Sequence, residues 1–498
     1  MPSANLFIRT WCQLLAIVLC GMLCLHAPDS APAAESAPSV KPNFVVFLID
    51  DLGWNDIACY GRTLYETPHI DRLASQGMKW NCAYAACCVC SPSRAALLTG
   101  KYPARLHLTD IVQGTPPPGT KLRVPDWTRY LPLEEITLAE ALKPAGYVSA
   151  NIGKWHLGGF ENFSATGDGR EADPIAQGFD VNVAGSEQGQ APDYFFPYKR
   201  KVLLPKPGST EKVEKEFDIP KLPGGQVGEF LTERLTTEAV KFIQQNRERP
   251  FFLYFSHFTV HTSIGARLQA KPATIAKYEA KLKNQPEQKQ RNATYAAMVE
   301  SMDDSVGQVL HALDELKIAD RTIVIFTSDN GALQNTTSLS PLRGWKGTAY
   351  EGGVRVPLII KWPGAIQPGS TSDVPVIGMD LYPTILEIAG VERVAKQALD
   401  GESLVPLMKQ TNALKRDAIY WHYPHYGYAT KPYGSMRQGD WKLIEYFESG
   451  EFELFDLKND IGEIQNLVAT SPAKVRAMHQ QMLEWRRQVG AQMPTKGM

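Results

Sequence analysis

The fold is decided by a short stretch near the start of the chain, Asn43-Phe44-Val45-Val46-Phe47-Leu48-Ile49-Asp50-Asp51. Its apolar residues do not alternate with polar ones, which is typical of a strand covered on both faces. Such a strand belongs to a mostly parallel sheet with helices on both sides. The stretch therefore predicts an α/β fold in which Asp50 and Asp51 lie at the carboxyl end of a buried strand.

Further strand and helix patterns follow in alternation, which implies a mostly parallel sheet with right-handed crossovers. Strands are expected at Tyr147–Ile152, Phe251–Ser256, Thr322–Thr327 and Pro357–Lys361. Helices are expected near Leu138–Lys143, Glu229–Gln245, Tyr295–Leu316 and Leu381–Ile388. Residues 161–225 are rich in Gly, Pro and charge, and we expect them to form long surface loops around a substrate cleft.

The pattern changes at about residue 415. Asp440–Ile444 and Glu451–Asp456 flank a Ser-Gly turn and predict an antiparallel hairpin, and a final helix is expected over Pro472–Val489. We therefore expect a large mixed, mostly parallel sheet sandwiched by helices in residues 41–415. A smaller antiparallel sheet with a helix is expected in residues 416–498.

The first 34 residues have the pattern of a signal peptide. Arg9 precedes the apolar run Leu14–Leu25, and the small residues Ala31–Ala34 follow it. That run is short for a membrane span, and no later segment is long and apolar enough to be one. We expect an exported protein, periplasmic or secreted, without stable membrane insertion; an uncleaved N-terminal anchor is the alternative. The formal charge of −1 gives no sign of a nucleic-acid surface.

Five cysteines lie beyond the predicted signal peptide: Cys59, Cys82, Cys87, Cys88 and Cys90. They are too clustered to form the disulfide framework of a large domain. Zinc is not expected, because paired Cys-x-x-Cys spacing is missing. One or two local bridges among the first four remain open, with no pairing assigned.

The sequence Cys90-Ser91-Pro92-Ser93-Arg94-Ala95-Ala96-Leu97-Leu98-Thr99-Gly100 predicts a short helix with a thiol at its start. Pro92 suits a first helical position, and Gly100 can end the helix in a left-handed conformation. Unpaired backbone N–H groups and the helix dipole favour an anion at this end. Arg94, one turn on, brings a guanidinium towards the same place. A buried structural cysteine is the alternative interpretation of Cys90.

This string resembles the signature of the type I sulfatases, Cys-x-Pro-Ser-Arg followed by Leu-Thr-Gly. The resemblance extends from about Asn43 to Leu467 and includes Gly347–Pro357. It implies an alkaline phosphatase-like fold with residues 41–415 as the catalytic domain. It also implies that a formylglycine-generating maturation enzyme oxidises Cys90 to formylglycine (3-oxoalanine), whose hydrated aldehyde is the nucleophile.

Polar side chains follow the predicted strands at the carboxyl ends, where ligands of such sheets bind. They are Asp50, Asp51, Lys154, His156, His257, His261, Asp329 and Asn330, together with Lys346 in a loop before the last strand. Three carboxylates and one amide oxygen suit Ca²⁺ or Mg²⁺, and without a cation the carboxylates would repel one another. The resemblance implies one Ca²⁺ ion, with Mg²⁺ less favoured, bound by Asp50, Asp51, Asp329, Asn330 and the side chain at position 90. No histidine is expected among the ligands, unlike the two-zinc sites of related phosphatases.

The resemblance further implies hydrolysis of a sulfate ester through a covalent sulfo-enzyme. Lys154 and Lys346 would bind sulfate oxygens, and Arg94 would hold the hydroxyl of the nucleophile. His261 would protonate the leaving alcohol, and His156 would take the proton from the second hydroxyl. His257 competes with His261 for its role, although its place near the strand favours packing. Ser186 is a further site candidate on a poor local match.

Two other functions remain open. One is a phosphatase or phosphonate monoester hydrolase of the same superfamily, and the other is a non-catalytic binder of sulfated glycans. The predicted export and the aromatic residues of Trp421–Tyr433 favour a sulfated carbohydrate as substrate, above a small aryl sulfate or a lipid.

Overall fold

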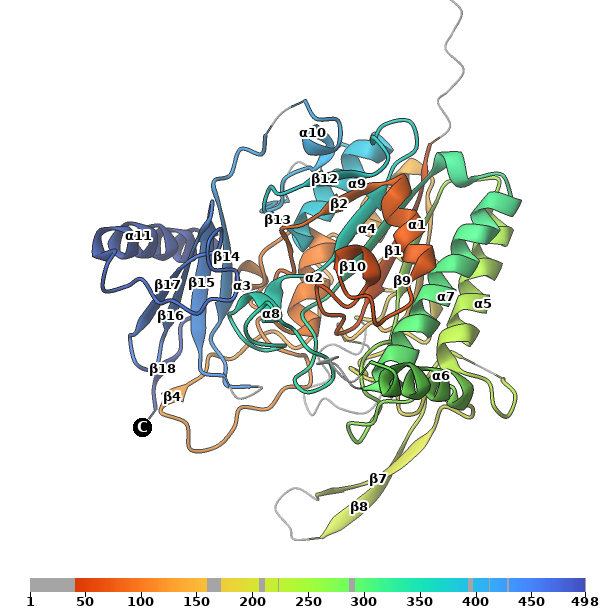
Figure 1. Cartoon of the computed structure of the whole chain (residues 1–498), viewed down its shortest axis with the longest axis horizontal. Coiled ribbons are helices and arrows are strands. Elements are labelled where there is room, and N and C mark those ends of the chain that lie inside the picture. The colour runs from red at the N-terminus through yellow and green to blue at the C-terminus, as the bar shows by residue number, and fades with distance from the viewer. Residues whose placement is uncertain are drawn as a thin grey trace, which may run out of the picture. The chain divides into compact units, whose positions relative to one another are not determined.

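The computed structural model describes residues 41–158, 172–205, 211–222, 224–285, 292–392, 397–411, 413–427 and 430–497. The predicted signal peptide, residues 1–34, lies outside these residues. None of the described helices combines the length and the apolar character needed to cross a bilayer. Figure 1 shows the arrangement of the elements.

An eight-stranded mixed sheet contains the strand with which the sequence analysis began. In sheet order its strands are β12 (Ser370–Ser372), β2 (Met78–Trp80), β11 (Leu358–Lys361), β10 (Thr322–Ser328), β1 (Asn43–Ile49), β9 (Phe251–Ser256), β5 (Val148–Gly153) and β6 (Val181–Val183). The five strands from β10 to β6 are parallel, and β11 is antiparallel to both of its neighbours. The prediction of a mostly parallel, mixed sheet is confirmed.

Side chains of β1 alternate between two hydrophobic cores, one on each face of the sheet. Val45, Phe47 and Ile49 lie in the core formed with α1 (Pro68–Gln76), α5 (Leu231–Asn246) and α7 (Ala293–Glu315), and α6 (Pro272–Lys283) packs on α7. Phe44, Val46 and Leu48 lie in the core formed with α2 (Cys90–Thr99), α4 (Leu138–Leu142) and α9 (Leu381–Ala389). Burial on both faces explains why this strand is apolar throughout. In Figure 1 the two groups of helices lie on opposite sides of the sheet.

Several short elements connect these strands and helices. They are α3 (Pro103–Leu106), α8 (Glu351–Val354), α10 (Val405–Met408), the pair β3 (Ala83–Tyr84) and β13 (Val376–Ile377), and 3₁₀ turns at Ala58–Tyr60, Lys143–Ala145, Ala319–Arg321 and Gly378–Asp380.

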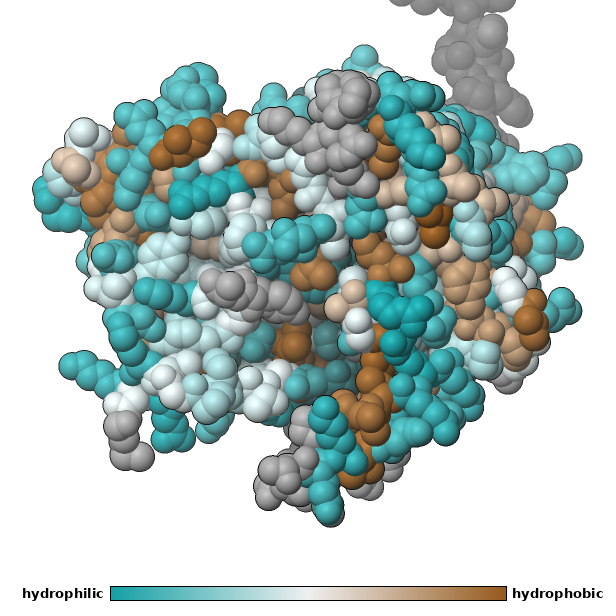
Figure 2. Space-filling view, turned by 60° about the horizontal axis from the view of Figure 1, so that its bottom comes forward, coloured by the Kyte–Doolittle hydropathy of each residue, from teal (hydrophilic) through white to brown (hydrophobic). Residues whose placement is uncertain are grey.

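Residues 161–225 contain more regular structure than the sequence predicts. A hairpin of β7 (Arg200–Pro205) and β8 (Lys212–Phe217) projects from the lower side of the molecule in Figure 1. Leu203 is 63% exposed and Val213 is 52% exposed, so the hairpin carries apolar side chains into solvent. Figure 2 brings this side forward and shows a mainly hydrophilic face with apolar atoms in separate groups.

The second sheet is antiparallel and begins at Ala418. Its strands are β14 (Ala418–Tyr423), β15 (Tyr433–Gln438), β16 (Trp441–Tyr446) and β17 (Phe452–Asp456), followed by α11 (Pro472–Val489) and by β18 (Thr495–Lys496), which pairs with β4 (Leu122–Arg123). One face packs on α11 through residues such as Met436 and Leu443. The other face packs through Trp421 and Ile444 against the segment that leads into α2. The predicted hairpin and final helix are confirmed.

A buried cluster of charges joins this second sheet to α8. Lys442 Nζ lies 2.9 Å from Glu351 Oε1 and 3.0 Å from Glu463 Oε1, and all three side chains are fully buried. Burial alone would raise the pKa of Glu351, but Lys442, Arg355 and Arg437 outweigh it and lower the pKa to about 2. Glu351 is therefore ionised at neutral pH.

We expect Glu351→Gln to destabilise the protein by about 3–5 kcal/mol at neutral pH, because it removes the carboxylate that pairs with the buried Lys442 and Arg355 and leaves Lys442 with Glu463 alone. The folded pKa lies below the ordinary value, so the contribution of the carboxylate is full above about pH 4.5 and is lost as the pH falls towards 2. The difference in melting temperature between wild type and variant should therefore shrink between about pH 5 and pH 3. A difference that stays constant over this range would contradict the assignment.

Candidate active site

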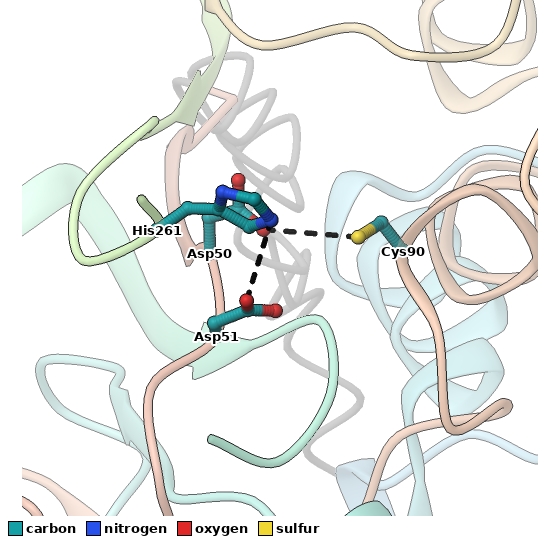
Figure 3. A group of neighbouring side chains, drawn as sticks. All are labelled: Asp50, Asp51, Cys90 and His261. Carbon is teal, nitrogen blue, oxygen red and sulfur yellow. Dashed lines mark hydrogen bonds and ion pairs between the residues drawn. The ribbon is translucent and has the colours of Figure 1, made fainter. Parts of the chain in front are cut away.

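The residues predicted from the strand ends come together at the carboxyl edge of the large sheet. Figure 3 shows four of them: Asp50 and Asp51 extend from the end of β1, Cys90 from the start of α2, and His261 from the loop after β9. The sulfur of Cys90 lies 3.9 Å from Asp50 Oδ1, and Lys346 Nζ donates to it at 3.1 Å. The loop that carries Lys346 reaches this edge because β11 is antiparallel and begins beside the end of β10.

Helix α2 holds the backbone of Cys90 in place. Cys90 is itself the first helical residue, and Gly100 ends the helix at φ 71°, the left-handed conformation that glycine adopts without strain. Every residue of α2 is buried. Burial raises the pKa of the Cys90 thiol to about 11, although Lys154 and Lys346 oppose this. The unmodified side chain is therefore a neutral thiol at neutral pH, and a poor nucleophile.

Asp50 and Asp329 are held by two buried cations. Lys154 Nζ donates to Asp50 Oδ2 at 2.8 Å, and Arg94 donates to Asp329 Oδ2 from Nε at 2.9 Å and from Nη2 at 2.7 Å. Burial would raise the pKa of Asp50, but Lys154, His261 and Arg94 together bring it well below its usual range. Arg94 also donates to Ser256 Oγ. Arg94 thus ties α2 to the ends of β9 and β10.

Asp51 contacts three other site residues, and its own backbone is left-handed, with φ 61°. Its Oδ1 lies 2.7 Å from Lys346 Nζ and accepts a hydrogen bond from Asn330 Nδ2 at 2.6 Å. Its Oδ2 lies 3.4 Å from His261 Nε2. The Nδ1 of His261 lies 2.7 Å from Thr262 O, and because a carbonyl only accepts, Nδ1 carries the hydrogen. Nε2 therefore faces Asp51 and the centre of the site.

The donor set fits a hard divalent cation. Two buried oxygens, Asp51 Oδ2 and Asn330 Oδ1, have no hydrogen-bond partner, which leaves them available as metal ligands. Ligand atoms of Asp50, Asp51, Cys90 and His261 lie within 4.8 Å of one another. Two details differ from the sequence-based expectation. His261 belongs to this cluster although no histidine was expected there, and Asp329 Oδ2 is engaged by Arg94.

His156 lies beside this cluster and is held through its backbone. Its N–H donates to Ser186 O at 2.8 Å, its carbonyl accepts from Ser91 Oγ at 2.8 Å, and its φ is 59°. Burial, followed by Lys154 and Arg94, holds the pKa of the His156 imidazole well below its usual range. Its Nδ1 has no hydrogen-bond partner, so the neutral ring can accept a proton. Ser186 contacts His156 only through its backbone carbonyl, and its side-chain Oγ accepts a hydrogen bond from Gln188 N.

A close contact with Gly189 sets the position of the His156 ring. A Cβ at Gly189 would lie 2.6 Å from His156 Cε1 and 2.7 Å from Nε2. We expect Gly189→Ala to displace the ring and to lower kcat by about 10- to 100-fold, because small misplacements of catalytic groups are costly. Gly378→Ala is the control, since its Cβ would meet only Tyr84 O at 3.8 Å. Equal activity of the two variants would show that the Gly189 contact does not position His156.

His257 and His261, the two candidates for the same role, lie in different surroundings. The ring centroid of His257 lies 4.1 Å from that of Phe255 and 6.3 Å from that of Phe47. Burial lowers the pKa of His257 to about 3. His257 therefore packs in the core, and His261 alone of the two reaches Asp51. Sequence reasoning missed Ser256, whose only signal was a hydroxyl at the last position of a buried strand.

The comparisons with known proteins agree with this geometry. A family model described as Sulfatase matches residues 42–391. The chain belongs to the sulfatase family. A second family model, described as N-sulphoglucosamine sulphohydrolase, C-terminal, matches residues 344–488 of the sulfatase. The predicted membership of the type I sulfatases, in the alkaline phosphatase superfamily, is confirmed, and the protein is a sulfuric ester hydrolase.

Similar proteins include a bacterial and a human sulfatase. A protein of Formosa agariphila described as Sulfatase is 35% identical, over 92% of this chain and 90% of its own length. Human steryl-sulfatase is 32% identical, over 78% of this chain and 73% of its own length. The crystal structure of Ps i-CgsB in complex with k-i-k-neocarrahexaose superposes with a TM-score of 0.71 at 28% identity, and the match covers 90% of this chain and 93% of that chain.

Proposed function

We propose that this sulfatase removes sulfate from a sulfated carbohydrate in an exported compartment, with Cys90 oxidised to formylglycine and one Ca²⁺ ion in the site. The observation that carries the proposal is the arrangement around Cys90. A buried sulfur faces Asp50, and Lys346 reaches both that sulfur and Asp51. A position at a helix start, flanked by cations and by carboxylates, suits a nucleophile that attacks the sulfur atom of an anionic sulfate group.

The residues of the chain have distinct tasks in this proposal. Lys154 and Lys346 would hold the sulfate oxygens as charge redistributes, and Arg94 would orient the hydroxyl of the hydrated aldehyde at position 90. His261, with Nε2 facing the site, would give a proton to the departing alcohol oxygen. His156 is neutral and would take the proton of the second hydroxyl when sulfate is released.

Asp50, Asp51, Asp329 and Asn330 would hold the Ca²⁺ ion. When bound, the ion would supply positive charge to the nucleophile and to the sulfate oxygens. The unpartnered oxygens of Asp51 and Asn330 support this ligand set. Lys154 and Lys346 lie against the same carboxylates, so ion binding would free their ammonium groups for sulfate.

The support for a carbohydrate substrate comes from the similar structures rather than from the aromatic residues. Trp421, Tyr423 and Tyr433 are buried, and Trp421 Nε1 donates to Ala85 O at 2.8 Å. They pack between the second sheet and the large domain and offer no surface for stacking on sugars. The structure that contains a carrageenan-type oligosaccharide is similar over most of the chain. Export is supported by the pattern of residues 1–34.

The test is a desulfation screen with protein produced together with a maturation enzyme. Defined sulfated oligosaccharides are compared with a steryl sulfate, 4-nitrophenyl sulfate and 4-nitrophenyl phosphate, and the mass of the Cys90 peptide is measured. We expect turnover of an oligosaccharide, loss of activity with a chelator and recovery with Ca²⁺. Faster cleavage of the phosphate would favour a phosphatase, and binding without cleavage would favour a glycan-binding protein.

A further inference from the structure

Lys346 reaches the site from a loop, residues 343–353, which we call the Lys346 loop. Its Nζ lies 3.1 Å from Cys90 Sγ and 2.7 Å from Asp51 Oδ1, and its side chain is 1% exposed. A lysine ammonium sits at the end of a flexible stem, so its position depends on where the backbone is held. What holds the Lys346 loop therefore decides the placement of this charge.

The Lys346 loop is closed tightly on itself. Gly352 N donates to Arg343 O at 2.7 Å, which joins its two ends. A Cβ at Gly352 would lie 2.5 Å from Gly344 O, and one at Gly353 would lie 2.2 Å from Thr348 O. Backbone packed this closely has no room to rearrange internally. A displacement of either end would therefore move the whole loop, including Lys346.

One loop end, Glu351, is held from two sides: Tyr84 and Arg355 come from the segments around β3 and α8, and Lys442 and Glu463 come from the second sheet and the segment after it. The Glu351 carboxylate accepts from Lys442 Nζ at 2.9 Å, from Tyr84 Oη at 2.7 Å and from Arg355 Nη1 at 3.2 Å. Its backbone N–H donates to Glu463 Oε2 at 2.7 Å. Lys442 lies on β16, and Glu463 follows β17. We call residues 416–498, which contain the second sheet and α11, the C-terminal subdomain; both residues belong to it, and both side chains are fully buried.

Glu463 also contacts the other loop end. Its carbonyl oxygen accepts from Arg343 Nη1 at 2.8 Å, and the Arg343 guanidinium carbon lies 3.9 Å from the centre of the Tyr350 ring. One residue of the C-terminal subdomain thus binds both ends of the Lys346 loop. Buried charges that lose a partner are strongly destabilised, so this network favours one arrangement.

We propose that Lys442 and Glu463, which contact none of the reacting groups, are positioning residues that fix Lys346 over Cys90. The C-terminal subdomain then acts in catalysis through the Lys346 loop. This inference rests on the proposed function, because the sulfate-binding role of Lys346 is part of it.

The test is a double-mutant cycle on matured full-length protein, with kcat/KM for 4-nitrophenyl sulfate as the readout. We expect Lys442→Met to lower kcat/KM by about 100-fold in the wild-type background, the cost of a misplaced catalytic group. In the Lys346→Ala background, Lys442→Met should lower kcat/KM by less than about 3-fold, because the lysine that Lys442 positions is then absent. Equal costs in both backgrounds, or wild-type kcat/KM for Lys442→Met, would overturn the inference.

Arg416→Met provides the matched control. It breaks the Arg416–Asp380 ion pair, which joins the start of the C-terminal subdomain to the large domain without contacting the Lys346 loop. A purely structural role of Lys442 predicts that both variants lower the melting temperature and that neither is coupled to Lys346. If Lys442→Met does not fold, Glu463→Leu, which removes the oxygen that accepts from Glu351 N and the one that faces Lys442, takes its place in the cycle. A Lys346→Ala variant with wild-type kcat/KM would overturn the role given to Lys346, and the inference with it.

Discussion

Cys90→Ser should stop steady-state turnover of a sulfate ester after a single cycle, because the covalent intermediate forms but is not released. A serine hydroxyl in this position can attack sulfur, because Lys346 and Asp50 still surround it. Release of sulfate by cleavage of the carbon–oxygen bond needs two hydroxyls on one carbon, and serine has one. The variant should therefore stop as a sulfo-serine ester.

Mass spectrometry of the peptide that contains position 90, after incubation with substrate, measures this outcome. The expected result is a mass increase of one sulfuryl group on the introduced serine, with one equivalent of alcohol released per protein. Cys90→Ala is the control, since it should show neither the adduct nor the release. Sustained turnover by Cys90→Ser would show that the aldehyde hydrate is not required.

His261→Gln should lower kcat for a sulfated sugar by about 10²- to 10⁴-fold, the usual contribution of a general acid. For 4-nitrophenyl sulfate the loss should be several-fold at most, because nitrophenolate leaves without a proton. The reason lies in the geometry: Nδ1 of His261 faces Thr262 O, so Nε2 is the nitrogen that faces the site.

The comparison of the two substrates separates this role from a loss of structure. His257→Gln is the matched control, because His257 lies four positions earlier in the chain and packs against Phe255. It should lower stability and affect both substrates alike. An equal loss for both substrates in His261→Gln would show that this residue does not protonate the leaving group.

The central strands could be predicted because each is buried on both faces. β1 and β9 follow the apolar runs residue for residue, and α11 follows its predicted bounds. The edge strands β12 and β6, and β2 next to β12, are only three residues long, too short for a pattern to appear. The β7–β8 hairpin was missed because charged and apolar residues share its exposed faces.

The site residues could be predicted as a group, because the carboxyl ends of parallel strands meet at one edge. The ion pairs among them could not be predicted, because the spacing of residues along the chain does not show which cation lies against which carboxylate. His261 was expected as an acid only, and the structure brings it beside Asp50, Asp51 and Cys90. Lys442 and Glu463 gave no signal at all, because charged residues of this kind are usually exposed.

The complete burial of α2 has a consequence for the biogenesis of the enzyme. No second protein can insert its own catalytic pocket around a sulfur enclosed by the finished fold. If Cys90 is oxidised by a maturation enzyme, that reaction must take place on the nascent or newly exported chain, before folding buries α2. Folding and oxidation would then compete in time, and a molecule that folds first would remain inactive.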